Sequence, residues 1–178
     1  MKLPPTPGLG LLVLALLTPL RAAEALPRPE AKLAALGLTL PATTPPVANY
    51  VPTVRTGNLV FLSGHLPYDA EGKVITGKVG RDADEKMANA AARTTTLALL
   101  ASLKKEIGEL SKVKRIVKVS GFVNSTDDFK AQPAVINGCS DLLVAVFGDR
   151  GKHARAALGL AALPRGAVVE IEMIVEVD

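Results

Sequence analysis

The segment at residues 168–177 constrains the fold of this chain more than any other. Its positions alternate between apolar side chains and, for the most part, glutamate. The apolar set is Val169, Ile171, Met173, Val175 and Val177, and the glutamates are Glu170, Glu172 and Glu176. Alternation with a period of two predicts a β-strand that buries one face. Because Ile174 lies among the glutamates, we expect the other face to meet further subunits as well as solvent.

Two longer stretches have the features of helices. The first runs from Asp82 to Ile107, with an Asp cap at its start and Gly108 as its stop. Helical spacing places its expected inner face at Met87, Ala90, Ala91, Thr94, Leu97, Ala98 and Ala101. The second helix follows Asp127-Asp128 and ends near Phe147. The small residues of the first helix predict a close approach to a sheet.

Further strands are predicted on either side of these helices. Apolar runs indicate strands at Tyr50–Arg55, Leu59–Ser63, Val113–Val123 and Arg155–Leu163, with a short one at Lys73–Val79. Gly57-Asn58 and Pro164-Arg165-Gly166 are expected to be turns. One face of the third run is expected to hold Val117, Val119, Gly121 and Val123. Two helices packed on one face of a mixed sheet make an α+β domain.

The N-terminal part has a different organisation. Lys2, an apolar run from Leu9 to Leu17 and the sequence Ala23-Glu24-Ala25 follow the order of a secretory signal peptide. We therefore expect residues 1–25 to be a signal peptide cleaved after Ala25, giving a periplasmic or secreted protein without a stable membrane anchor. Residues 26–48 are expected to hold a short helix, Pro29–Leu36, and a proline-rich linker, and residues 49–178 the α+β domain.

Composition argues against several kinds of site. The net charge is +4, but the basic residues are scattered, so no nucleic-acid partner is expected. Aromatic residues are only 3%, which leaves no stacking platform for single strands. The single cysteine, Cys139, lies in an apolar run and is interpreted as a buried, inert thiol. The histidines His65 and His153 form no metal-binding pattern, and His65 is interpreted as a structural loop residue.

Four segments taken together carry a resemblance to a known family. They are Tyr50-Val51, Gly57 to Pro67, Lys118 to Phe129, and Ala154 through Pro164 to Glu172. In this combination the chain resembles, over about residues 47–178, the Rid (YjgF-type, L-PSP endoribonuclease-like) family of imine and enamine deaminases. An extra helical turn after Phe129 is similar to a longer-helix branch of that family.

The resemblance implies a fold, an assembly and an activity. The fold is chorismate-mutase-like α+β, and the assembly is a homotrimer with ligand sites in clefts between subunits. The activity is hydrolysis of reactive 2-imino acids, or their enamine tautomers, to 2-keto acids and ammonia. No cofactor and no metal are implied, and the expected ligand is a small 2-imino or 2-keto carboxylate.

The resemblance also implies the site residues. The carboxylate-binding arginine of the family corresponds to Arg155, its site tyrosine to Tyr50 and its asparagine to Asn137. Its glutamate, which helps to position water, corresponds to Glu170. The reactive cysteine of the family is replaced by Ala157. A role that depends on a thiol therefore does not transfer, and the pocket that sets the substrate preference is altered.

The residues are compatible with this chemistry. Arg155 shares its predicted strand face with Ala157, Gly159 and Ala161, and these small neighbours leave room for a guanidinium to hold a carboxylate by two parallel hydrogen bonds. The structural alternative is an arginine paired with a glutamate of the last strand. Imine hydrolysis further requires an oriented substrate, a water beside C2 and a proton relay, and Glu170 is the candidate for acting through that water.

Strand geometry suggests how Arg155 and Glu170 are related. If residues 164–166 close a regular hairpin, paired residue numbers sum to about 330. Arg155 then lies near Val175 and roughly 16 Å from Glu170 along the sheet. The two residues are therefore expected to share a pocket only across a subunit interface.

The same residues are compatible with other roles. Tyr50 is also compatible with a packing tyrosine, Asn137 with a polar helix position and Glu170 with a solvent-facing strand charge. A non-catalytic trimer that binds small carboxylates or acts as a chaperone is the main alternative function. The Ala157 replacement and an exported location both favour that alternative. A ribonuclease is disfavoured because the chain lacks an obvious histidine pair and a concentrated basic stripe.

Overall fold

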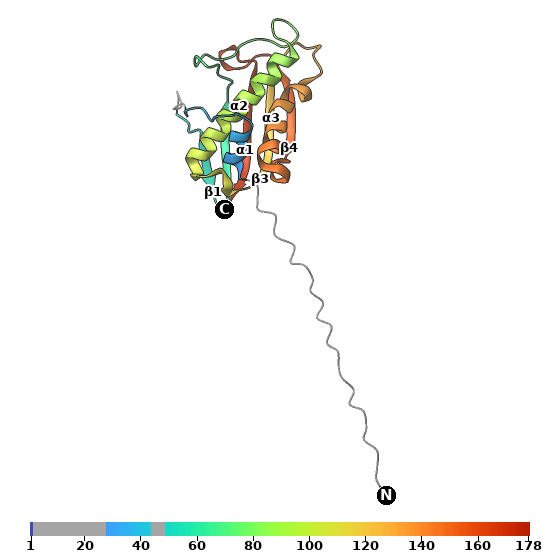
Figure 1. Cartoon of the computed structure of the whole chain (residues 1–178). Coiled ribbons are helices and arrows are strands. Elements are labelled where there is room, and N and C mark those ends of the chain that lie inside the picture. The colour runs from blue at the N-terminus through green and yellow to red at the C-terminus, as the bar shows by residue number, and fades with distance from the viewer. Residues whose placement is uncertain (2–27, 44–48) are drawn as a thin grey trace.

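The computed structural model describes residues 28–43 and 49–178, together with Met1. Its elements follow the order expected of the α+β domain (Figure 1). They are α1 (Pro29–Ala35), β1 (Thr53–Thr56), β2 (Leu59–His65), α2 (Glu85–Ile107), η1 (Leu110–Lys112), β3 (Val113–Asn124), α3 (Gln132–Phe147), η2 (Gly148–Gly151), β4 (Ala154–Leu160), η3 (Pro164–Gly166) and β5 (Val169–Val177). Apart from Met1, the predicted signal peptide lies outside the described residues and stays a prediction.

The five strands form one mixed sheet in the order β1-β2-β5-β3-β4. Neighbouring strands are antiparallel except for β3 and β4, which are parallel. The predicted hairpin between the last two strands is therefore wrong, because β3 lies between β4 and β5. The turn at Pro164–Gly166 is present as η3, but it leads the chain across β3 to the far side of that strand.

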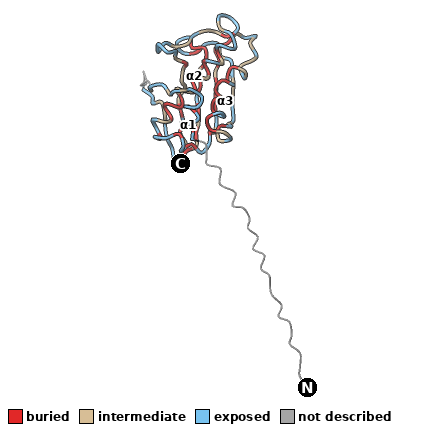
Figure 2. Tube along the Cα trace, viewed as in Figure 1, coloured by how far each residue is buried: buried red, intermediate tan, exposed pale blue. Residues whose placement is uncertain are grey.

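The helices α2 and α3 pack on one face of the sheet, which confirms the predicted layer arrangement (Figure 1). Buried residues are concentrated where the helices meet the sheet (Figure 2). On β5, the residues of the predicted apolar set are all buried on this side. The opposite face, called the open face below, carries the glutamates of β5. Its exposed apolar residues include Val54 and Phe61, which are 53% and 41% exposed.

The buried face of α2 differs from the predicted one by about one position. Met87 is 37% exposed and Ala90 is exposed, whereas the neighbouring Ala88 and Ala91 are buried. The full buried set is Ala88, Ala91, Ala92, Thr95, Thr96, Leu99, Leu100, Ala101, Ser102, Leu103 and Ile107. Alanine and threonine differ little in hydropathy, so the periodicity marked the helix but not its orientation. The predicted end at Ile107 and the Asp cap are confirmed, but the helix begins at Glu85, three residues after the predicted Asp82. Asp84 caps the N-terminus by accepting a hydrogen bond from the Met87 N–H at 2.7 Å.

Two glycines bring α3 close to its neighbours. A Cβ on Gly121 of β3 would lie 2.5 Å from the side chain of Ile136, and one on Gly138 of α3 would lie 2.1 Å from the carbonyl oxygen of Asn89. The Asn89 side chain also donates to the carbonyl oxygen of Ala134 at 2.8 Å. These contacts fix the axial position of α3 against both α2 and the sheet, and with it every side chain that α3 presents to β4.

The short helix α1 packs beside α3 and η1. Its Leu33 is 4% exposed, and Glu30 accepts a hydrogen bond from the Leu110 N–H at 2.8 Å. The prediction of a short helix that begins at Pro29 is confirmed. Of the helices in the described ranges, none combines the length and apolar character needed to cross a membrane.

Three local predictions are corrected. Residues 73–79 form no regular strand but isolated bridges with four different partners, and Gly77 within them has a φ of 146°. The first strand begins at Thr53, so Tyr50 precedes it. In β3, Val119, Gly121 and Val123 share the helix-facing side as predicted, but Val117 does not. A register irregularity against β5 lies between Ile116 and Lys118, and Ile116 is the residue buried in its place.

Candidate functional site

Arg155 lies on β4 and faces α3. It pairs with Val119 of β3, and paired residues point to the same side of a sheet. Val119 is fully buried beneath the helices, so Arg155, and with it Ala157 and Gly159, belongs to the helix-facing side at the exposed edge of the sheet. The small neighbours predicted for Arg155 are therefore present beside it, although Ala161 lies beyond the end of the strand.

Two side chains of α3 hold the Arg155 guanidinium. Its Nη1 donates to Oδ1 of Asn137 at 2.8 Å and to Oγ of Ser140 at 3.0 Å. The structure thus brings together two of the predicted site residues, Arg155 and Asn137. The alternative of an ion pair between Arg155 and a glutamate of the last strand is wrong, because those glutamates lie on the open face.

His153 completes this group. Its Nε2 lies 3.1 Å from Oγ of Ser140, and its Nδ1 lies 2.7 Å from the carbonyl oxygen of Gly151. Burial lowers the pKa of His153, the bond to Gly151 opposes this, and the positive charge of Arg155 lowers it further. We call Arg155, Asn137, Ser140 and His153 the arginine half-site.

Glu170 belongs to a second group of residues at the far end of β5. It alternates with the buried Val169 and Ile171, so it lies on the open face. A Cβ on Gly64 of β2 would lie 2.0 Å from the Glu170 carboxylate, so a larger residue at position 64 would displace the end of that side chain from its present place. Burial, and then the charge of Glu172, raises the pKa of Glu170 above its ordinary value. We call Glu170 and Gly64 the glutamate half-site.

The residue that follows Tyr50 is hydrogen-bonded to the residue that precedes Gly64 of the glutamate half-site. The Ser63 hydroxyl donates to the carbonyl oxygen of Val51 at 2.7 Å, and Ser63 directly precedes Gly64. Tyr50 is 50% exposed. The segment that carries Tyr50 is therefore anchored at the same end of β2 as Gly64, and away from Arg155.

The two half-sites are separate within one chain. Arg155 pairs with Val119, whereas Glu170 pairs with Phe122, three residues further along the same strand. The offset of three residues corresponds to about 10 Å along the strands. Because β3 lies between β4 and β5, the two residues are also about 10 Å apart across the sheet. The side chains also point from opposite faces. The expectation that Arg155 and Glu170 share no pocket within one subunit is confirmed, although its basis in a β4–β5 hairpin is wrong.

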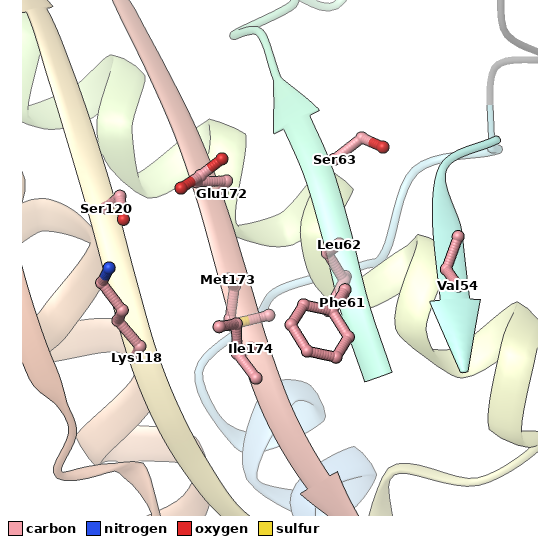
Figure 3. Close-up of a pocket in the computed structure, with 9 residues that line it drawn as sticks. All are labelled: Val54, Phe61, Leu62, Ser63, Lys118, Ser120, Glu172, Met173 and Ile174. Carbon is pink, nitrogen blue, oxygen red and sulfur yellow. The ribbon is translucent and has the colours of Figure 1, made fainter. Parts of the chain in front are cut away.

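The open face carries a shallow hollow of about 200 Å³. Figure 3 shows Glu172 and Ser63 at one end of it, and Phe61 and Ile174 closer to the other. Lys118 and Ser120 line its side on β3. The hollow combines apolar and charged side chains, and the contact of this face with other subunits stays a prediction.

His65 has a structural position at the end of β2. Its Nδ1 lies 2.7 Å from the carbonyl oxygen of Ser63, and its Nε2 lies 2.7 Å from Oγ of Ser102 on α2. These bonds tie the strand to the helix. The interpretation of His65 as a structural residue agrees with this geometry, although it lies in a strand and not in a loop.

Three residues of the half-sites were missed by sequence reasoning. Ser140 and His153 give no signal in a single sequence, because the bond from Arg155 to Ser140, and that between Ser140 and His153, depend on how α3 packs against its neighbours. Gly64 had a weak signal, since a glycine within a strand often marks the close approach of another group. Within the described ranges, no cluster of three or more histidine, cysteine or acidic side chains has the arrangement of a metal site.

Cys139 is expected to be unreactive. Its side chain is fully buried, and this burial raises the pKa of the thiol to about 11. A thiol-specific disulfide reagent at neutral pH should therefore label the native protein far more slowly than the denatured protein, in which labelling should reach one thiol per chain. Fast labelling of the native protein would show that α3 opens readily or that Cys139 is accessible.

Comparisons with known proteins agree with the fold. Residues 30–177 match the family described as "YjgF/chorismate mutase-like, putative endoribonuclease". Protein TCP17 of Trypanosoma cruzi is 42% identical over 152 residues, which cover 85% of this chain and 95% of that protein. A 2-iminobutanoate/2-iminopropanoate deaminase of Dermatophagoides farinae is 28% identical over 144 residues, which cover 79% of this chain and 95% of that protein. The crystal structure of Atu1372 from Agrobacterium tumefaciens superposes with a TM-score of 0.78 and 47% sequence identity. The match covers 84% of this chain and 94% of that chain.

Proposed function

Since this chain belongs to the YjgF/chorismate mutase-like family, we propose that it hydrolyses reactive 2-imino acids, or their enamine tautomers, to 2-keto acids and ammonia. The observation that carries the proposal is the arginine half-site. A guanidinium beside the small residues Ala157 and Gly159, with one nitrogen already held by Asn137, is suited to bind a small carboxylate. The relative from Dermatophagoides farinae, named for this deaminase activity, supports the same conclusion.

The proposed site is completed by a second subunit of a homotrimer. Arg155 would bind the substrate carboxylate, and Glu170 and Tyr50 would come from the neighbouring chain. Two observations support this: the half-sites lie apart in one chain, and the open face exposes Phe61 and Val54. A trimer that joined the open face of each subunit to its neighbour would cover these side chains and bring Glu170 into an interface.

The proposed reaction needs only water. The imine reacts in its protonated form, C=NH2⁺. Glu170 accepts a proton from a water molecule as its oxygen attacks C2, and the C=N π electrons pass to the nitrogen, which becomes a neutral amine. That proton then passes to the amino nitrogen of the tetrahedral intermediate. Loss of ammonia breaks the C–N bond while the hydroxyl oxygen, losing its proton to solvent, forms the new carbonyl. A raised pKa makes the Glu170 carboxylate a stronger base, in keeping with this task.

The activity is tested by generating 2-imino acids in situ with an amino acid oxidase and trapping what remains with semicarbazide. The protein should speed the loss of free imine and so lower the amount that semicarbazide traps. Arg155→Ala should lower kcat/KM on the order of a hundredfold or more, because two charge-assisted hydrogen bonds are removed. Arg81→Ala is a matched control, because Arg81 is exposed and pairs only with the adjacent Asp82 among the described residues.

A non-catalytic carboxylate-binding trimer is the second candidate, and the Ala157 replacement favours it. This function predicts no acceleration with any imino acid side chain, while 2-keto carboxylates still bind and Arg155→Ala abolishes that binding. The imine-trapping assay separates the two candidates, because only the deaminase speeds the loss of imine, whereas calorimetric titration should detect binding of 2-oxobutanoate in both cases.

A further inference from the structure

The hydrogen bonds of Arg155 leave one edge of its guanidinium free. Nη1 carries two hydrogens, and the bonds to Asn137 and Ser140 use both of them. No hydrogen bond joins Nε or Nη2 to any residue within 28–43 and 49–178. The Nε–H and one Nη2–H lie parallel on the same edge, so this edge can still bind a carboxylate through two hydrogen bonds.

The orientation of Ser140 follows from the bond that His153 makes to the backbone. The carbonyl oxygen of Gly151 can only accept, so Nδ1 of His153 carries the proton. In the neutral imidazole Nε2 is then an acceptor, and the Ser140 hydroxyl donates to it. With its hydrogen turned toward His153, the Ser140 oxygen directs a lone pair at Nη1 of Arg155.

We propose that Ser140 and His153 are positioning residues, which fix the Arg155 guanidinium so that its Nε–Nη2 edge meets the substrate carboxylate. The inference rests on the proposed function for the identity of the ligand. Arg155 is exposed, and a free arginine side chain has many rotamers. Holding it before the ligand arrives lowers the entropic cost of binding.

The backbone supports this arrangement from both sides. A Cβ on Gly151 would lie 2.3 Å from the carbonyl oxygen of Leu143, so only glycine allows η2 to pack against α3 this closely. The same glycine supplies the carbonyl that sets the tautomer of His153. On the other side, the close contact of Gly138 with Asn89 fixes α3 and hence Ser140.

A nucleophilic role for Ser140 fits the geometry less well. A hydroxyl beside a histidine is a familiar catalytic pair. Here, however, the Ser140 oxygen also accepts a hydrogen bond from a positively charged guanidinium, which withdraws electron density from the attacking atom. Ser140 lies inside α3, where the backbone N–H groups are used by the helix and cannot form an oxyanion hole.

The test compares Ser140→Ala and His153→Leu with the conservative variants Ser140→Thr and His153→Gln in the full chain. The first pair should raise KM for the imino acid, and Kd for 2-oxobutanoate, by about five- to tenfold, with kcat within about twofold of the wild type. Ser140→Thr keeps the hydroxyl, and in His153→Gln the side-chain amide oxygen can replace Nε2 as an acceptor. This second pair should therefore restore most of the affinity.

A spectroscopic readout excludes a merely structural effect. In the wild type, the Nε–H of Arg155 should give a resolved NMR signal that Ser140→Ala broadens while the rest of the spectrum is retained. An unchanged Kd in both Ser140→Ala and His153→Leu, or the absence of 2-oxobutanoate binding by the wild type, would overturn the inference. If the wild type shows no turnover but the Kd pattern holds, the proposed deaminase activity fails and the positioning role stands.

Discussion

Mixing two separately inactive variants, Arg155→Ala and Glu170→Gln, is expected to restore about one quarter of the wild-type activity. The expectation follows from a site that takes Arg155 from one subunit of a trimer and Glu170 from the next. In an equal mixture, the subunit that supplies position 155 carries arginine in half of the sites, and the subunit that supplies position 170 carries glutamate in half of them. Each site is therefore complete with a probability of about one quarter, provided that subunits assemble at random.

The physical reason is the distance between the half-sites in one chain. Arg155 faces α3, whereas Glu170 lies on the open face two strands away. No side-chain rotation brings the two groups to one ligand. The measurement is imine turnover after the two variants have been unfolded together and refolded, compared with each variant treated alone.

A matched pair supplies the control. Arg155→Ala and Asn137→Ala alter residues that the same chain brings into contact at 2.8 Å. A mixture of these two variants can assemble no complete arginine half-site, so it should show no activity beyond the mean of the separate variants. If the first mixture behaves like this control, or if the wild type is a monomer at micromolar concentration, the shared-site arrangement is incorrect.

The strands show how far the sequence alone leads to this fold. The alternation of β5 located that strand to within one residue, because one of its faces is fully buried. The neighbours of β5 were not predictable in the same way. A turn at Pro164–Gly166 is equally compatible with a hairpin and with a crossing, and the choice is made by β3, which pairs with β4 on one side and β5 on the other.

Some of the site residues could be predicted from the sequence, whereas others depend on packing. Arg155, Asn137, Tyr50 and Glu170 were identified through a family resemblance, and the contact between Arg155 and Asn137 agrees with it. Ser140 could not be found in this way, because its bond to Arg155 arises from the depth at which α3 packs on α2. That depth is set by the contact of Gly138 with Asn89, which leaves no pattern in a single sequence.

Glu170→Gln is expected to lower kcat by about 10²- to 10⁴-fold while making the protein more stable near neutral pH. The loss of rate follows from the removal of the group proposed to accept the proton of water. The gain in stability follows from the pKa of Glu170, which burial and then the charge of Glu172 raise above 4.5. Glutamine occupies the same space beside Gly64 without a charge that must be desolvated.

The sign of the pH dependence is fixed by this shift. A carboxyl whose pKa is higher in the folded state contributes stability that is fully present below its unfolded pKa of 4.5 and is lost as the pH rises through the folded pKa. The Tm of Glu170→Gln should therefore exceed that of the wild type near neutral pH, and the difference should shrink as the pH falls below 4.5. Thermal unfolding across this range measures the effect.

Glu172→Gln is the matched control, because it removes a charge from the same strand face without removing the proposed base. It should keep most of the turnover, and it should shift the acidic limb of the kcat profile to lower pH, because the like charge that raises the pKa of Glu170 is gone. Loss of turnover in Glu172→Gln as large as in Glu170→Gln would assign the proton transfer to the pair and not to Glu170. Full turnover in Glu170→Gln would remove this residue from the mechanism, and a backbone group or Tyr50 would then have to orient the water.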